Sequence, residues 1–369
     1  MNLQETIELA AGVDSNGHPL DADHIGGASR RLTTRTPSEI LAMTFDDRDN
    51  MLGDRLLADG QSLVIAGAGG IGKSRLLLQL AAACISGRPF IALETHAREK
   101  RWLVVQAENS NRRLRQDLEA IARWVGADFE AFNRLVVLHT LETDSDALLS
   151  INDPEANREI ARLIDDHSPD VVAFDSLYNF QAGDLHSDAD MRNTLLGIAR
   201  LAKAGNPKRS IIVVHHAGTG KAGAARAIGY ERSGFGRNSK VLHSWTRGQI
   251  NIAPGSRDSN ESLVFTCGKC SNGREFAPFA AKLTAGMIYE RDPSFDLQAW
   301  EAEMTGKDRH PLITLQRVAE LCKPAMSKAA LAKSILEDCG CAKPTAYRWI
   351  DRATRKTIKI GKDGCYFSR

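Results

Sequence analysis

A glycine-rich octapeptide, GAGGIGKS at residues 67–74, stands between the apolar run SLVIA and the stretch RLLLQLAAACI. The first run is rich in β-forming residues, and the second repeats its apolar residues at helical spacing. The glycines therefore lie between a predicted strand and a predicted helix. The G-x-x-x-x-G-K-[ST] pattern requires this context, because glycines let successive backbone N–H groups surround a phosphate and the helix N-terminus adds its positive dipole. The octapeptide predicts a phosphate-binding loop, and a chance glycine-rich turn is the weaker interpretation.

Each position of this loop has an expected role in binding ATP with Mg²⁺. Lys73 would contact the β- and γ-phosphates, and Ser74 would ligate Mg²⁺. The other positions expected to contact the nucleotide are Gly67, Gly69, Gly70, Gly72 and Arg75.

Composition limits the classes of protein that remain. With 369 residues and 43% hydrophobic content, the chain can bury one large core and a smaller one. The first residues, MNLQETIELA, show no basic start followed by a hydrophobic stretch, and no apolar run approaches a membrane span. Seven cysteines with irregular spacing suit reduced thiols better than a disulfide framework. We expect a cytoplasmic protein that does not associate with membranes.

Strand and helix patterns alternate along the chain after the loop. Strand-like runs such as RWLVVQAE, DVVAFDS and SIIVVHHA are separated by helical patterns such as NRRLRQDLEAIARWV and PEANREIARLIDDH. This alternation predicts an α/β fold with a mainly parallel sheet flanked by helices. We expect a flexible arm at 1–36, the ATPase domain at 37–292, a polar linker at 293–310 and a small domain at 311–369.

Two acidic residues stand at the ends of predicted strands. Asp175 ends VVAFD and would hold Mg²⁺ through its water shell. Glu108 ends WLVVQAE and would align and deprotonate the attacking water. Its alternative role is at the start of the next helix, but Asn109 and Ser110 are better capping residues.

The ordered set GAGGIGKS, VVQAE, VVAFDS and IIVVHHAG resembles the RecA-like ATPases, and most closely the plasmid RepA-type hexameric replicative helicases. The resemblance covers about residues 37–290. It includes RTPSEIL before the loop and GFGRNSKVLHSWTR after the histidines.

This resemblance implies roles for residues that contact the γ-phosphate. It gives His215 or His216 the position of a sensor between the nucleotide and the DNA. It gives Arg247 the role of an arginine finger offered to a neighbouring subunit. The match departs from the family at RNSK, so other cations remain candidates for action across the subunit interface: Arg232, Arg237 and Lys269.

The C-terminal segment has a different character. Residues 307–369 hold 14 Lys or Arg against six Asp or Glu, whereas the whole chain has a net charge of only +2. Three helix-length patterns followed by IKIGKDGCYFSR look like a winged helix. In such a domain the third helix would enter the major groove and the hairpin would contact phosphates. The expected nucleic-acid contacts are Thr345, Tyr347, Arg348, Arg352, Arg355, Lys359 and Lys362, and protein docking is the alternative.

Three functions are compatible with these features. The first is a ring-forming DNA motor, expected as a hexamer, that serves as a replicative helicase of a mobile element and has a primase or initiator as a candidate partner. The second is a nucleotide-controlled DNA-binding regulator or loader that hydrolyses ATP without translocating. The third is a small-molecule phosphotransferase. Glu108 and the basic C-terminal segment argue against the third, because a water-activating base would waste ATP in a kinase.

Overall fold

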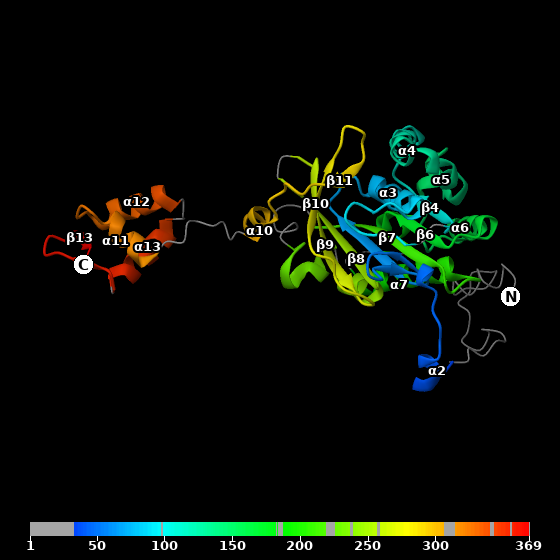
Figure 1. Cartoon of the computed structure of the whole chain (residues 1–369), viewed down its shortest axis with the longest axis horizontal. Helices are drawn as coiled ribbons and strands as arrows, with labels where there is room; N and C mark the ends of the chain where they lie inside the picture. The colour runs from blue at the N-terminus through cyan, green and yellow to red at the C-terminus, as the bar shows by residue number, and fades with distance from the viewer. Residues whose placement is uncertain are drawn as a thin grey trace. The chain divides into compact units, whose positions relative to one another are not determined.

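A sheet of nine strands forms the centre of the first part of the chain. The computed structural model describes residues 33–96, 99–181, 183, 187–218, 226–236, 239–256, 259–305, 314–339, 343–354 and 356–368. In chain order the strands are β3 (Ser62–Gly67), β4 (Trp102–Gln106), β5 (Val136–Leu138), β6 (Val171–Asp175), β7 (Ser210–His216), β8 (Gly248–Pro254), β9 (Ser262–Cys270), β10 (Phe279–Leu283) and β11 (Tyr289–Arg291). Their spatial order is β11-β10-β9-β8-β3-β7-β6-β4-β5 (Figure 1).

Six neighbouring strands of the sheet run parallel to one another: β8, β3, β7, β6, β4 and β5. Strands β9, β10 and β11 extend the sheet beyond β8, and each is antiparallel to its neighbours. Strand β7 lies between β3, which leads into the glycine-rich loop, and β6, which ends at Asp175. The predicted mainly parallel sheet is confirmed.

Helices cover both faces of the sheet. On one side α3 (Lys73–Ser86) contacts α4 (Asn111–Val125) and α5 (Phe129–Leu135). On the other side α7 (Asp188–Lys203) contacts α6 (Pro154–His167) and α9 (Ser239–Trp245) (Figure 1). Helices α4 and α6 begin where the sequence predicts because local caps define their starts: Ser110 accepts a hydrogen bond from a backbone N–H of α4, and Asp153 accepts one from α6.

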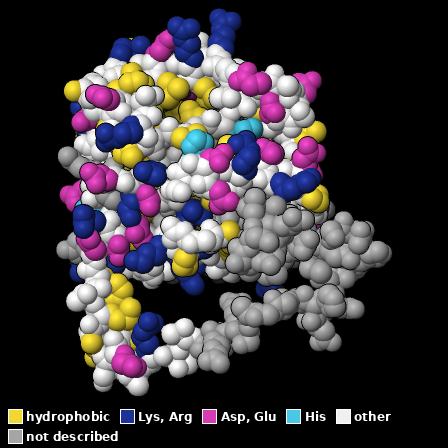
Figure 2. Space-filling model, turned by 90° about the vertical axis from the view of Figure 1, so that its right-hand side faces the viewer, with side chains coloured by type: hydrophobic (Ala, Val, Ile, Leu, Met, Phe, Trp, Pro, Cys, Tyr) yellow, Lys and Arg dark blue, Asp and Glu magenta, His cyan; other side chains and the backbone are white. Residues whose placement is uncertain are grey.

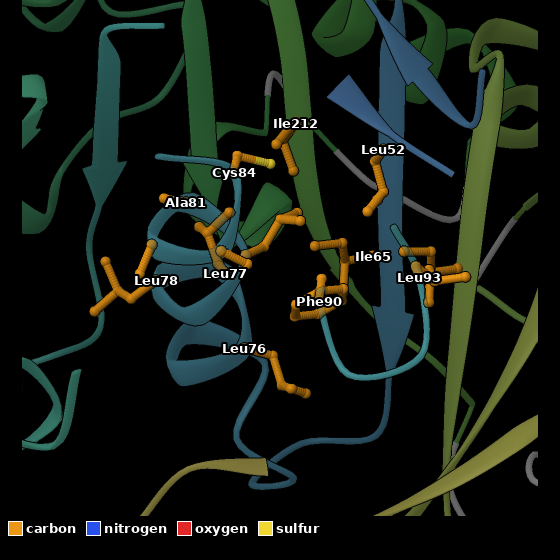
Figure 3. Close-up of a cluster of buried hydrophobic side chains, with 14 of the residues drawn as sticks. Leu52, Ile65, Leu76, Leu77, Leu78, Ala81, Cys84, Phe90, Leu93 and Ile212 are labelled. Atoms are coloured by element: carbon orange, nitrogen blue, oxygen red, sulfur yellow. The ribbon is translucent and has the colours of Figure 1, made fainter. Parts of the chain in front are cut away.

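Helix α3 is buried on nearly all sides, because it lies on the sheet and is itself covered by α4 and α5. Figure 3 shows Leu77 on the side of the helix that faces Ile65 of β3 and Ile212 of β7, whereas Leu78 points away from these strands. A helix that is apolar all round needs such enclosure. The core therefore fixes the helix that follows the loop, and with it the position of the loop.

The segment before the sheet carries a short exposed helix, α2 (Pro37–Leu41). Its capping box joins Thr36 and Glu39, yet none of its residues is buried. Strands β1 (Asn50–Leu52) and β2 (Leu57–Ala58) follow it and pair with each other. Around α2 the side chains of Ile40, Leu41, Met43 and Phe45 are exposed, and Figure 2 shows hydrophobic side chains on the segment that projects below the body. Of the expected arm, residues 1–32 lie outside the described part of the chain.

The chain divides into two compact units, Met1–Leu297 and Gln298–Arg369. The expected linker at 293–310 contains a helix, α10 (Leu297–Thr305), and its last five residues are not among those described. The second unit then contains α11 (Leu315–Leu321), α12 (Lys328–Cys339), α13 (Lys343–Thr354), β12 (Ile358–Ile360) and β13 (Tyr366–Ser368). The two strands pair as an antiparallel hairpin, and the helices and the hairpin share a separate small core. Within the described ranges no helix is long and apolar enough to cross a bilayer.

A buried ion pair ties α3 to α4. Asp117 accepts a hydrogen bond from Nε of Arg75 at 2.8 Å and one from Nε of Arg113 at 3.0 Å. The Arg75 and Asp117 side chains are almost completely buried, whereas that of Arg113 is 41% exposed. The Arg75 side chain, which the sequence assigned to the nucleotide, thus has a partner within the protein.

We expect Asp117→Asn to lower the free energy of unfolding by about 3 kcal/mol, because it leaves the buried Arg75 guanidinium without a counter-charge. The urea midpoint measures this change. Glu119→Gln, which removes a carboxylate from an exposed ion pair on the same helix, is the matched control and should shift the midpoint far less. Equal shifts for the two variants would show that the buried pair does not stabilise the fold.

Candidate active site

The glycine-rich loop is shaped by two left-handed glycines. Gly70 has φ +75° and Gly72 has φ +85°, where any other residue would be strained. A Cβ atom at Gly67 would lie 3.0 Å from the carbonyl oxygen of Ile252 on the neighbouring strand. Gly72 is the N-cap of α3, so the loop ends directly at the positive end of the helix dipole. The backbone therefore has the form of an anion-binding turn.

Lys73 lies within this turn. Its Nζ donates a hydrogen bond to the carbonyl oxygen of Ala68 at 2.7 Å and lies 3.3 Å from Nδ1 of His216. Burial lowers the pKa of Lys73 to about 8, against the opposing charges of Asp175 and Glu108. The ammonium group thus lies in a poorly solvated position in which a phosphate chain would be a favourable partner.

Asp175 ends β6 beside the first turn of α3. The carboxylate is buried, and burial raises its pKa to about 6, while a hydrogen bond with Ser74 acts in the opposite direction. A hydroxyl and a carboxylate placed together are hard oxygen ligands of the kind Mg²⁺ prefers. Ser74 and Asp175 therefore fit the predicted metal site.

Glu108 lies beyond the end of β4 and is held by three neighbours. Its Oε1 accepts a hydrogen bond from Oγ of Ser176 at 2.5 Å and one from Nδ2 of Asn179 at 3.2 Å, and Nε2 of His216 lies 3.6 Å away. His216 first, and then Ser176 and Asn179, hold the pKa of Glu108 down to about 2, against the effect of burial. The carboxylate is ionised and oriented, with 38% of its side chain exposed.

The structure separates the two candidate sensor histidines. Adjacent residues of a strand point to opposite faces, and on β7 it is His216 that lies opposite Gly67 and approaches both Lys73 and Glu108. His215 is buried on the other face. His216 therefore connects the loop lysine to the candidate water-orienting carboxylate.

The candidates for action across a subunit interface lie elsewhere on the sheet. Arg247 directly precedes β8, and its backbone N–H donates to the carbonyl oxygen of Ser62 at the start of β3. The loop lies at the other end of β3, so roughly 17 Å separates the two along the strand. Arg247 is exposed, and no ion pair or hydrogen bond joins its side chain to another described residue. It cannot reach the loop of its own chain.

Lys269 and Arg232 line one pocket of ≈ 640 Å³ together with His243 and Glu275. Both cations have partners, since Lys269 donates to the carbonyl oxygen of His243 at 2.6 Å and Arg232 donates to Glu275 at 2.7 and 2.8 Å. Arg237 lies outside the described residues. Among the described candidates, Arg247 is the one with an unengaged guanidinium.

The expected nucleic-acid contacts lie on α13 and the hairpin of the second unit. Arg348, Arg352, Lys359 and Lys362 are exposed. Tyr347 is half-buried beneath Nζ of Lys328, which lies 5.8 Å from its ring centroid. Thr345 lines a pocket of ≈ 390 Å³ on α13 with both exposed arginines of that helix. Arg355 is not among the described residues.

Sequence reasoning missed the residues that support the site. Ser176 and Asn179 follow the strand-end acid in the stretch DSLYNF, and polar residues directly after such an acid were the available signal. Tyr289 contacts the loop but could not be recognised from the local sequence, because it lies more than 200 residues from the loop.

Comparisons with known proteins agree with the loop and its surroundings. Residues 29–222 match the AAA domain family. The structure is similar to that of a KaiC-like protein from the hyperthermophilic archaeon Pyrococcus horikoshii OT3, with 14% sequence identity, 64% of this chain and 91% of that chain covered, and a TM-score of 0.43. No curated protein matches the sequence. Because the family match spans more than half of the chain and includes the loop, Glu108, Asp175 and His216, the chain belongs to the AAA domain family of P-loop ATPases.

Proposed function

We propose that the chain is an ATP-hydrolysing DNA motor that assembles as a ring and serves as a replicative helicase of a mobile element. One observation carries the proposal. Lys73, Glu108 and His216 are assembled at one end of the sheet, whereas the unengaged Arg247 lies at the other end of β3. An ATPase built this way is completed by the Arg247 of another copy.

The residues at the loop suit transfer of a phosphoryl group to water. Lys73 and the N-terminus of α3 would hold the phosphates, and Mg²⁺ held by Ser74 and Asp175 would neutralise charge on their oxygens. Glu108 is exposed enough to accept a hydrogen bond from water. His216, Ser176 and Asn179 hold the carboxylate ionised and oriented, so it can align the attacking water and accept its proton.

We expect Lys73→Ala to abolish ATP hydrolysis and to weaken ATP binding, because the main point charge on the phosphates is lost. Glu108→Gln should keep ATP binding and lose turnover by about 10²-fold or more. A phosphate-release assay and fluorescent-nucleotide titration measure the two effects. The control is Glu159→Gln, which alters an exposed carboxylate on α6 and should hydrolyse ATP normally. Normal turnover in Glu108→Gln would place the water-orienting group elsewhere.

Assembly into a ring is supported by two features of the first unit. The position of Arg247 suits contact with the loop of a neighbouring copy and not with its own. The exposed apolar side chains around α2 are the second feature, because a five-residue helix is marginal in water without tertiary packing. Burial of Leu41, which is 85% exposed, against a second copy would stabilise that helix.

We expect Arg247→Ala to reduce turnover by about 10³- to 10⁵-fold, the range reported for arginine fingers. Mixing it with inactive Lys73→Ala protein should restore activity, since some interfaces then join an intact loop to an intact arginine. Arg123→Ala, which removes an exposed arginine from α4, is the control and should keep full activity. Rings that form from the mixture yet show no turnover would argue against a shared site.

The second unit is proposed to bind DNA through α13 and the hairpin. Its support is the charge excess of residues 307–369 and the exposure of Arg348 and Arg352 on one helix. Phosphate contacts release counterions, so they make affinity depend on salt concentration.

We expect Arg348→Ala to weaken duplex DNA binding and to make the dependence of log Kd on log salt shallower by roughly one unit. Fluorescence anisotropy across a salt series measures both. Lys333→Ala removes an exposed cation from α12 and is the matched control, which should leave the slope unchanged. The same slope in wild type and Arg348→Ala would favour protein docking by this unit.

A regulator or loader that hydrolyses ATP without translocating is the second candidate, and the basic second unit suits it equally well. Strand displacement on forked DNA separates the two, since only a motor should release the displaced strand in an ATP-dependent way. A primase or initiator as a further partner stays a prediction.

A further inference from the structure

Strand β11, the outermost strand of the sheet on its antiparallel side, contacts the phosphate loop through one tyrosine. The hydroxyl of Tyr289 donates a hydrogen bond to the carbonyl oxygen of Ile71 at 3.2 Å. Ile71 lies between the two left-handed glycines of the loop, and Tyr289 is 3% exposed. This contact joins two parts of the chain that are far apart in sequence.

The tyrosine also packs directly on the end of the loop. A Cβ atom placed on Gly72 would lie 3.0 Å from the Tyr289 hydroxyl and 3.4 Å from its Cε2. Two features therefore require glycine at position 72: the positive φ of the backbone and the close approach of the Tyr289 ring.

Gln79 on the second turn of α3 holds the tyrosine in place. Its Nε2 donates to the carbonyl oxygen of Tyr289 at 2.7 Å, and its Oε1 accepts from the Tyr289 backbone N–H at 3.0 Å. Gln79 is buried, and Figure 1 shows β11 beside α3. The side chain thus reproduces the pair of hydrogen bonds that a neighbouring strand would make.

Peptide geometry gives the Tyr289 hydrogen bond a consequence for nucleotide binding. The peptide between Ile71 and Gly72 is planar and trans, so its carbonyl oxygen and its N–H point in opposite directions. A bond that holds the Ile71 carbonyl toward Tyr289 therefore directs the Gly72 N–H away from the tyrosine hydroxyl. Burial raises the pKa of Tyr289, so the hydroxyl stays protonated and remains a donor.

We infer that Tyr289 is a positioning residue of the phosphate loop, which orients the Gly72 N–H toward the phosphates of the bound nucleotide. Gln79 supports this role by holding the Tyr289 backbone on α3. The inference rests on nucleotide binding by the loop and not on the motor activity, so a failure of strand displacement would leave it intact.

The test is Tyr289→Phe in the full chain, which removes the hydroxyl and keeps the aromatic ring over Gly72. We expect the Kd for MgADP and the KM for MgATP to rise by about 3- to 10-fold, because the hydrogen bond from the misoriented Gly72 N–H to phosphate is weakened. The kcat should stay within about 2-fold, because an N–H that contacts phosphate contributes equally to the ground state and the transition state. The melting temperature without nucleotide should fall by only about 2–4 °C, the effect of one lost hydrogen bond, and the stabilisation by MgADP should be smaller than in wild type.

Tyr366→Phe is the matched control, because Tyr366 is a buried tyrosine on β13 of the second unit, and it should bind MgADP as wild type does. Gln79→Leu is a second variant that should weaken MgADP binding while keeping the hydroxyl. The Tyr289→Phe, Gln79→Leu double variant should then bind MgADP no less tightly than the single variant with the lower affinity, since both substitutions act on one contact. Wild-type affinity in Tyr289→Phe, or full additivity in the double variant, would overturn the inference.

Discussion

The parallel register of β7 with its neighbours β3 and β6 sets the geometry on which the rest of the site depends. Gly67 lies opposite His216, and Asp175 lies opposite Val214, so these strands end at one edge of the sheet. The loop, the buried carboxylate and the histidine meet there because each follows directly from a strand end. A slip of one residue in β7 would exchange His216 for His215 and remove the link between Lys73 and Glu108.

Burial acts on the charged groups of this edge in different ways. It shifts the pKa of Lys73 down to about 8 and that of Asp175 up to about 6, which in both cases favours the neutral form. Glu108 moves in the opposite direction, because it is partly exposed and its neighbours stabilise the carboxylate. The two buried groups gain most from a charged partner, and a nucleotide with Mg²⁺ supplies charges of both signs.

Local patterns in the sequence predict much of the fold and the centre of the site. The boundaries of α4 and α6 follow from Ser110 and Asp153, whose capping interactions involve neighbours in the chain. The contacts of Tyr289 with the loop and with Gln79 could not be predicted, because they join residues about 210 positions apart and β11 is only three residues long. The choice between His215 and His216 depends on which face of β7 meets the loop, and that is decided by the pairing of strands.

The placement of the loop and Arg247 at opposite ends of β3 also constrains the symmetry of any assembly. A two-fold axis could pair each loop with the other copy's Arg247 only if both lay in one self-complementary patch, whereas a contact between two separate patches is head to tail. Head-to-tail contacts generate either an open chain or a closed circle. If Arg247 completes the loop of the next copy, as proposed above, an open chain leaves one loop at its end without a partner arginine, whereas a closed circle completes every loop. Closure would therefore give each copy an equivalent site without a special terminal subunit.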